Sequence, residues 1–281
     1  MMNPDMLYVI SPEEQNRETL TEILTAHPEI KFVSFMGVDF AGNDTDEKVP
    51  ISLFLKDIDG FLEGMAAQTD GSSGGLTGTL NNARVDMKID SSVNWYIDYN
   101  YEHFDSATGR MVGTLRIPCF LVHNNVRVDS RSILHDTLDY VEKELLELFK
   151  KHPQIAGLEH ISGEDIEKII FTCATELEFW VKSPREDAPI EALSSSQMMQ
   201  EQYWQRCRGN VRTALEQTVE MLEAYGLGPE MGHKECGGVR GQIDDNGHMT
   251  HVMEQLEVDW KYSYGVQTAD NELLARIIVK E

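Results

Sequence analysis

Ala174-Thr-Glu-Leu-Glu-Phe-Trp-Val181 is the stretch that decides the fold, because its alternation of polar and apolar side chains predicts a β-strand. Residues two apart on a strand point to the same face, so Glu176 and Glu178 stand side by side and the apolar residues face the other way. Burying two like charges is costly unless a pKa rises or divalent cations neutralise them. A lone Glu-x-Glu is also typical of a solvated strand face, so the choice depends on the rest of the chain.

The composition limits the possible classes of function. The chain has 281 residues, which predicts two domains, and a net charge of -24, which argues against nucleic-acid and anionic-membrane partners. Its four cysteines are widely spaced without a Cys-x-x-Cys motif and are interpreted as reduced, structural thiols. No signal-like N-terminus and no apolar run of about 18 residues is present, so we expect a soluble, cytoplasmic protein.

The first part of the chain is predicted to form mostly strands, with a helix before them and a short helix among them. Ser11-Pro-Glu-Glu14 is a typical helix start, and Leu20, Ile23 and Leu24 continue that helix as its apolar face. We expect a short helix over 57–62. Strand-like runs cover 31–38, 48–55, 83–89, 93–98 and 111–122. Together they predict a small, mainly β domain.

A long Gly/Ser/Thr/Asn loop covers 69–82 and leaves two interpretations open, a functional loop or a flexible connector. From Ser130 onward the apolar residues recur with the period of about 3.6 that is typical of a helix. Helices are predicted from Ser130 to about Lys151, over about 197–225 and over 268–280, and we interpret them as packing elements.

More carboxylates come after the second helix. Glu235 lies in a Gly-rich segment, and Glu254 and Glu257 lie in the strand-like run 252–260. Carboxylates on adjacent strands are what a two-metal site for phosphoryl transfer requires. Three nearby histidines are possible metal ligands, but a solvated side chain is the interpretation we favour for each: His233, His248 and His251.

These stretches, in this order, resemble glutamine synthetases from about residue 30 to the end. Glu176-Leu-Glu-Phe179 resembles the Glu-x-Glu-Phe strand that opens the family's catalytic site. The other similar segments are Thr69-Asp-Gly-Ser-Ser73, Arg84-Val-Asp-Met87 with Asp90, Gly232-His-Lys-Glu-Cys236 and Glu254-Gln-Leu-Glu-Val-Asp259.

The resemblance implies an α+β fold with an N-terminal extension (1–29), a small β-grasp domain (30–125) and the first part of a catalytic domain (126–281), an antiparallel sheet with flanking helices. It implies that Glu178, Glu235 and Glu257 hold one divalent metal, Mg²⁺ or Mn²⁺. The remaining implied roles are a second metal for Glu176, a nucleotide contact for Glu230, and ammonium binding in a neighbouring subunit's site for Asp70.

The function implied by the resemblance is ATP-dependent ligation of ammonia to the γ-carboxylate of L-glutamate through γ-glutamyl phosphate. A carboxylate is a poor acyl donor until it is phosphorylated, and only ammonia, not ammonium, is nucleophilic. L-glutamate and ammonium are the implied partners, together with further copies of the chain in a homo-oligomer whose sites lie between subunits.

The chain departs from the family pattern in three places. Glu235 and Glu257 are 22 positions apart, and we expect the insert 239–250 to form a surface hairpin. His233-Lys234 replaces a double histidine, and the chain ends before the family's later motifs, so we expect about half an active site. Two alternatives stay open: a truncated, non-catalytic homologue that assembles with a full-length synthetase, and a γ-glutamyl ligase for another amine, such as a polyamine.

Overall fold

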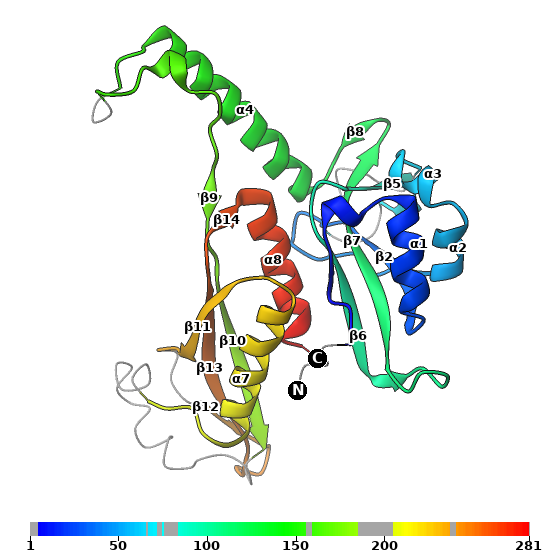
Figure 1. Cartoon of the computed structure of the whole chain (residues 1–281). Coiled ribbons are helices and arrows are strands. Elements are labelled where there is room, and N and C mark those ends of the chain that lie inside the picture. Colours follow the sequence, from blue (N-terminus) through cyan, green and yellow to red (C-terminus); the bar gives the residue numbers. More distant parts are fainter. Residues whose placement is uncertain are drawn as a thin grey trace. The chain divides into compact units, whose positions relative to one another are not determined.

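The structure of the chain is a computed structural model (Figure 1) that describes residues 5–65, 67–71, 75, 84–155, 159–184, 205–236 and 240–280. Two compact units are present. The N-terminal unit comprises Asp5–Cys173 and Ser263–Asp270, and the C-terminal unit comprises, within the described residues, 174–262 and 271–280. These limits differ from the three domains predicted from the sequence (1–29, 30–125 and 126–281). Those domain assignments stay predictions.

The N-terminal unit is built on an eight-stranded sheet with the order β1-β6-β7-β2-β3. In addition, β5 and β8 pair with β7, and β4 pairs with β5. Among the described strands β2 runs parallel to β7, and every other pairing in this sheet is antiparallel. The strands are β1 (Val9–Ile10), β2 (Ile30–Met36), β3 (Lys48–Pro50), β4 (Ala67–Asp70), β5 (Arg84–Ile89), β6 (Trp95–Phe104), β7 (Met111–His123) and β8 (Val126–Arg127).

The helix predicted from Ser11 is divided into two parts. Ser11 and Glu14 form a capping box around the short 3-10 helix η1 (Pro12–Glu14), and α1 (Arg17–Ala26) begins after a new N-cap at Asn16. The α1 side chains Leu20 and Leu24 are buried in the same core as residues of β2 and β6. Met6 and Ile10 belong to this core as well.

The strand predicted over 48–55 is wrong beyond Pro50. β3 ends there and α2 (Ile51–Lys56) follows, with α3 (Ile58–Leu62) after it as predicted. Pro50 is the N-cap of α2, and its φ of -57° suits the start of a helix. Proline also lacks the backbone N–H that would continue the hydrogen bonding of the β-strand. Phe54 is buried against Phe61, with ring centroids 5.3 Å apart, whereas Leu53 is 53% exposed.

The long helix predicted from Ser130 is confirmed as α4 (Ser130–Lys151), capped by the buried Asp129 side chain, which accepts a hydrogen bond from the Ser132 amide. At its start Arg131 donates to Asp90 and Asp270 at 2.7–2.9 Å, a buried ion-pair triad inside the N-terminal unit. After α4 come η3 (Gly163–Asp165) and β9 (Thr172–Cys173), which pairs with β14 (Ser263–Tyr264). None of the described helices combines the length and apolarity needed to cross a membrane.

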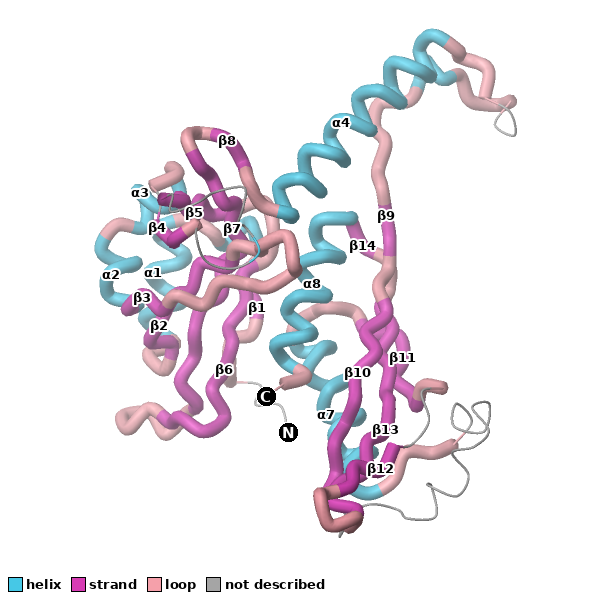
Figure 2. Tube along the Cα trace, turned by 180° about the vertical axis from the view of Figure 1, so that it is seen from behind, coloured by secondary structure: helices cyan, strands magenta, loops and turns pink. Residues whose placement is uncertain are grey.

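The C-terminal unit is an antiparallel sheet with β13 at its centre. β10 (Glu176–Pro184) pairs with one edge of β13 (Met249–Trp260), and β11 (Pro229–Lys234) pairs with the other, as Figure 2 shows from behind. The helices of this unit are α7 (Gly209–Ala224) and the part of α8 (Gly265–Ile278) from Asn271 onward; α8 confirms the helix predicted over 268–280. The beginning of the helix predicted over 197–225 lies outside the described residues.

The long gap between Glu235 and Glu257 is explained by an extended hairpin. β12 (Arg240–Ile243) continues beyond β11 along the same edge of β13, with Arg240 opposite Met253 and Lys234 opposite Leu256. A turn then leads back into β13, and the Asp244 carboxylate accepts hydrogen bonds from two amides of that turn. The surface hairpin predicted in the insert is confirmed for residues 240–250.

Candidate metal centre

The two faces of the C-terminal sheet carry different chemistry. Gly232 packs under α7, since an added Cβ would meet Leu215 and Val219 at 2.9–3.0 Å. Gly232 lies opposite Val258, which in turn lies opposite Leu177, so these apolar residues share the face that α7 covers. Alternation then places Glu176 and Glu178 on the opposite face, where both are exposed, as predicted.

Strand register assembles charged residues on that opposite face. Glu178, Glu257 and His233 lie opposite one another on β10, β13 and β11. Glu176 and Asp259 form the next row, and Glu235 follows His233 by two residues. The carboxylate face consists of Glu176, Glu178, His233, Glu235, Glu257 and Asp259.

Glu257 lies at the centre of the carboxylate face. One ligand atom from each of His233, Glu235 and Glu257 lies within 4.8 Å of the other two, and the same holds for Glu176, Glu257 and Asp259. Glu257 belongs to both groups and is only 7% exposed. The sheet therefore offers two overlapping three-residue groups that share one carboxylate.

The orientation of the His233 ring is fixed by the backbone. Its Nδ1–H donates to the Lys234 carbonyl oxygen at 2.8 Å, because a carbonyl oxygen only accepts. Nε2 is then directed at the carboxylates, 3.7 Å from Glu257 and 3.6 Å from Asp259. A backbone bond to one ring nitrogen is how metal-binding histidines are commonly held. The interpretation of His233 as a solvated residue is wrong.

The electrostatics of the cluster are unfavourable for full ionisation. A hydrogen bond with Glu235, burial, and the charges of Glu235, Asp259 and Glu176 together raise the pKa of Glu257 to about 8. The same hydrogen bond lowers the pKa of Glu235. Protonated Glu257 thus donates to ionised Glu235, as happens when carboxylates share a site without a cation.

The residues of the carboxylate face fit a hard divalent cation. Mg²⁺ and Mn²⁺ prefer carboxylate oxygen, and imidazole is also a common Mn²⁺ ligand in mixed sites. Ligand atoms within 4.8 Å of one another lie close enough to surround one ion at coordination distances of roughly 2.0–2.6 Å. A cation would also remove the repulsion that raises the Glu257 pKa.

The remaining predicted site residues lie elsewhere. Glu230 is exposed in an irregularity of β11, between Pro229 and Met231, and does not belong to either three-residue group. Asp70 ends β4 in the N-terminal unit, where it is exposed and lies opposite Arg84.

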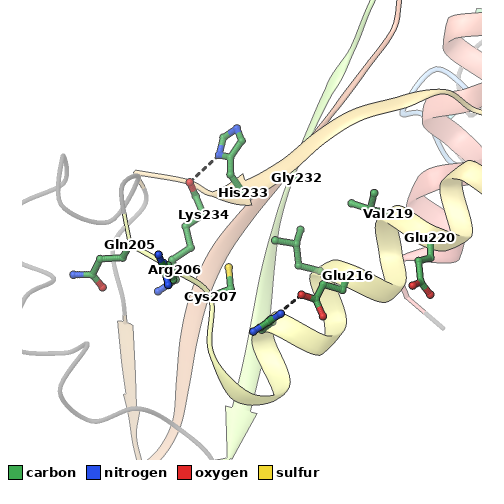
Figure 3. A pocket seen from close by; sticks show the side chains of 11 residues that line it. Gln205, Arg206, Cys207, Glu216, Val219, Glu220, Gly232, His233 and Lys234 are labelled. Carbon is green, nitrogen blue, oxygen red and sulfur yellow. Dashed lines mark hydrogen bonds and ion pairs between the residues drawn. The ribbon is translucent and has the colours of Figure 1, made fainter. Parts of the chain in front are cut away.

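Glu254 is not on the carboxylate face, although the sequence placed it among the site carboxylates. It lies on the face that α7 covers and forms a buried ion pair with Lys234; the two are 2% and 4% exposed. A hollow of about 680 Å³ lies next to Lys234 between α7 and β11. Figure 3 shows the side chains that line it. Lys234 is therefore part of the packing behind the sheet.

Sequence reasoning missed Asp259 as a member of the site and favoured a solvated side chain for His233. Asp259 follows Glu257 by two residues in a predicted strand, and His233 precedes Glu235 by two. The period of two that placed Glu176 beside Glu178 also places Asp259 on the face of Glu257 and His233 on the face of Glu235, but it does not bring His233 to Glu257, which depends on the pairing of β11 with β13.

Comparison with solved structures supports the fold. No protein-family model and no curated protein matches the chain. Similar solved structures include a complex of GmaS with ADP (TM-score 0.53, 14% identity, 93% of this chain and 48% of that one covered) and GmaS without ligand (TM-score 0.57, 12% identity, 92% of this chain and 48% of that one). Plasmodium falciparum glutamine synthetase, determined by cryo-electron microscopy, is also similar (TM-score 0.54, 17% identity, 94% of this chain and 48% of that one). The chain spans about half the length of these proteins. It has the predicted α+β, glutamine-synthetase-like fold, with antiparallel sheets and flanking helices.

Proposed function

We propose that this chain carries part of the active site of an ATP-dependent ligase that joins ammonia to the γ-carboxylate of L-glutamate. The observation that supports the proposal is the carboxylate face, which gathers five acids and one histidine on a glutamine-synthetase-like fold. Phosphoryl transfer between two anions needs this kind of ligand set, because catalysis depends on positioning the anions and neutralising their charge.

The proposed roles divide into two metal-holding groups. Glu178, Glu235 and Glu257 would hold the cation nearer to L-glutamate, although the structure groups Glu235 and Glu257 with His233 rather than with Glu178. Glu176 would hold the cation nearer to ATP, with Asp259 beside it. Bound Mg²⁺ or Mn²⁺ would supply neutralisation of the charge between the γ-phosphate and the attacking carboxylate.

The reaction has two balanced steps. An oxygen of the substrate γ-carboxylate attacks the γ-phosphorus of ATP, the O–P bond to ADP breaks, and γ-glutamyl phosphate forms. Ammonia then attacks the acyl carbon, and inorganic phosphate leaves. Asp70 would bind ammonium and accept its proton, because the nitrogen lone pair is available only in ammonia. Glu230 would contact the nucleotide.

We further propose that the working protein is a homo-oligomer in which Asp70 of one copy serves the carboxylate face of another. Because the chain spans about half the length of its structural neighbours, the complete site would also use groups that this sequence does not contain.

The test is an assay of the native protein, purified from its source cells together with whatever assembles with it. ADP release that requires L-glutamate, and incorporation of ¹⁵N-ammonium into glutamine, are the expected results with Mg²⁺ or Mn²⁺. Preferential use of a larger amine over ammonia would assign the protein to a different γ-glutamyl ligase. Metal binding without any glutamate-dependent ADP release would contradict the proposal and favour a non-catalytic role.

A further inference from the structure

Asp70 stands at the end of β4, where the Gly/Ser/Thr/Asn loop of 69–82 begins. Of this loop the structure describes residues 69–71 and Gly75. The segment 37–47 (the 37–47 turn) connects β2 to β3, and side chains from it bond to both described parts of the loop. The loop and the turn both belong to the N-terminal unit.

The 37–47 turn is held by hydrogen bonds within it and by one from α4. Backbone hydrogen bonds of 2.9–3.0 Å close the turn, among them one from the Asp39 amide to the Asn43 carbonyl oxygen. The Ser130 hydroxyl, at the start of α4, donates to the Asp39 carbonyl oxygen at 2.9 Å. The backbone at Asp39 is therefore fixed from two directions.

The Asp39 carboxylate connects the turn to the loop, and the residue is only 7% exposed. Its Oδ1 accepts hydrogen bonds from the Ala41 and Asn43 amides at 2.8 and 2.9 Å. Its Oδ2 accepts from the Asn43 side chain at 3.0 Å and from the Gly75 amide at 2.6 Å. Three of the donors belong to the turn, and the donor with the shortest bond belongs to the loop.

The contact between Asp39 and Gly75 depends on charge and on close approach. Burial raises the pKa of Asp39, but the hydrogen bonds from Asn43, Gly75 and Ala41 outweigh it, and the pKa lies below its usual range. Asp39 is therefore ionised at neutral pH, and bonds to an ionised acceptor are roughly twice as strong as neutral ones. A Cβ on Gly75 would meet Asp39 Oδ2 at 2.9 Å and the Ala41 nitrogen at 3.0 Å, so only glycine fits there.

A second hydrogen bond holds the loop on the other side of Asp70. Thr69 Oγ1 donates to Glu47 Oε1 at 2.6 Å. Asp70 directly follows this anchor, and Gly75 follows Asp70 by five residues. The Thr69–Glu47 bond is exposed to water whereas the Asp39 carboxylate is buried, so the Gly75 contact is the stronger anchor of the two.

We propose that Asp39 is a positioning residue, which holds the loop at Gly75 and thereby fixes Asp70 where the amine is bound. This inference rests on the proposed function, since the role of Asp70 toward the amine belongs to that reaction. With the Thr69 anchor alone, the chain after Asp70 would be free to turn about the end of β4. A displacement of about 1 Å at a reacting group can cost about 100-fold in rate, so a second anchor has a large effect.

Asp39→Asn separates the loop contact from the fold of the turn. The side-chain oxygen of the variant can still accept from the Ala41 and Asn43 amides, and the Asn43 side chain can rotate to accept from the added NH₂ group. That NH₂ group replaces Oδ2, and it cannot accept from the Gly75 amide because it is a donor. The variant therefore removes the Gly75 bond and retains the hydrogen bonding of the 37–47 turn.

The first measurement is nuclear magnetic resonance of the 281-residue chain, which is independent of the ligase assay. In Asp39→Asn the Gly75 amide is expected to exchange its hydrogen at least about 10-fold faster than in the wild type. The backbone order parameter of Asp70 is expected to fall below about 0.6, the range of flexible backbone. Asn43→Ala is the matched control, because it removes one hydrogen bond to Asp39 Oδ2 without touching Gly75, and it should change neither value.

Gly75→Ala breaks the same contact from the loop side, because its Cβ would meet Asp39 Oδ2. It should lower the order parameter of Asp70 as Asp39→Asn does. The two substitutions together should have no more effect than either one alone, since both remove one interaction. Agreement between them shows that the effect comes from the loop contact and not from a misfolded turn.

The second measurement is the KM for ammonium in the native assembly. Asp39→Asn is expected to raise it about 10-fold, whereas the KM for L-glutamate and the affinity for Mg²⁺ stay within about twofold of wild type. Adding Asp39→Asn to Asp70→Asn should cause no further rise, because a residue that acts through the Asp70 carboxylate has no effect once that carboxylate is gone.

The outcomes separate this inference from the proposed function. Wild-type hydrogen exchange at Gly75 in Asp39→Asn would overturn the inference, and so would an unchanged KM for ammonium in an active assembly. Additive effects of Asp39→Asn and Asp70→Asn would also overturn it, because Asp39 would then act on another part of the reaction. A more flexible Asp70 in an assembly without ligase activity would support the hold of Asp39 on the loop and reject only the reaction.

Discussion

Glu178 on β10 and Glu257 on β13 lie directly opposite each other in an unbroken antiparallel register. Opposed residues of antiparallel strands have Cβ atoms about 4.5–5.5 Å apart, and like charges at that separation are destabilising. The protein therefore has to neutralise this pair with a proton or a cation. In the metal-free protein a proton on Glu257 does so, because the hydrogen bond with Glu235, burial and the charges of Glu235, Asp259 and Glu176 raise the pKa of Glu257.

Glu257→Gln is expected to stabilise the metal-free protein at alkaline pH. The amide retains a hydrogen bond to Glu235 but removes one negative charge from a buried cluster. At pH 9 in EDTA, the melting temperature should rise by about 3 °C or more. Glu220→Gln, at an exposed position on α7, is the control and should change the melting temperature little. A melting temperature for Glu257→Gln at or below wild type would contradict the prediction.

The stability of the metal-free protein is expected to fall as pH rises from about 5 to about 8. The pKa of Glu257 is about 8 in the folded protein and near 4.3 in the unfolded chain, so the native state binds more protons across this window. Midpoints of urea unfolding at several pH values in EDTA measure the slope. Saturating Mg²⁺ should reduce the dependence of the urea midpoint on pH. A midpoint that rises with pH in EDTA would contradict the raised pKa of Glu257.

Lys234→Met is expected to destabilise the C-terminal unit by about 3–5 kcal/mol, because it leaves the buried Glu254 carboxylate without its partner. The double variant Lys234→Met, Glu254→Leu removes both charges and should recover most of the loss. Urea unfolding of the two variants and the wild type provides the measurement. Equal stability of single and double variants would show that the ion pair is not the cause.

Asp70→Asn is expected to act on the amine step alone. The amide neither binds ammonium as strongly as a carboxylate nor accepts its proton at neutral pH, so the KM for ammonium should rise at least about 10-fold. Affinity for Mg²⁺ should not change. The assay is glutamine formation by the native assembly, and an unchanged ammonium KM would remove Asp70 from the reaction.

Much of the site was predictable because one rule, the period of two in strands, applies to it. It placed Glu176 and Glu178 on one face, as observed. The same rule excludes Glu254 from the face of Glu257, since the two are three residues apart, and it brings in Asp259. Which strand lies beside which, however, depends on tertiary pairing, so the approach of His233 to Glu257 had no local signal.

The errors in the fold arose where local patterns are ambiguous. Ile51-Ser-Leu-Phe-Leu55 contains apolar residues that suit either a strand or a short helix, and packing of Phe54 on Phe61 decides for the helix. The apolar stripe of α4 predicted the helix correctly, but Val141 and Leu148 remain 40% and 47% exposed. The helical period shows that α4 has an apolar stripe, but it does not show which part of a protein packs on that stripe.

The most direct test of the central claim is a titration of the 281-residue chain with Mn²⁺, followed by electron paramagnetic resonance of the unbound ion. The carboxylate face predicts saturable binding that Glu257→Gln weakens at least about 10-fold, that Glu220→Gln leaves unchanged, and that strengthens as pH rises toward 8. Binding of equal strength in the wild type and Glu257→Gln would mean that these carboxylates do not form a metal centre.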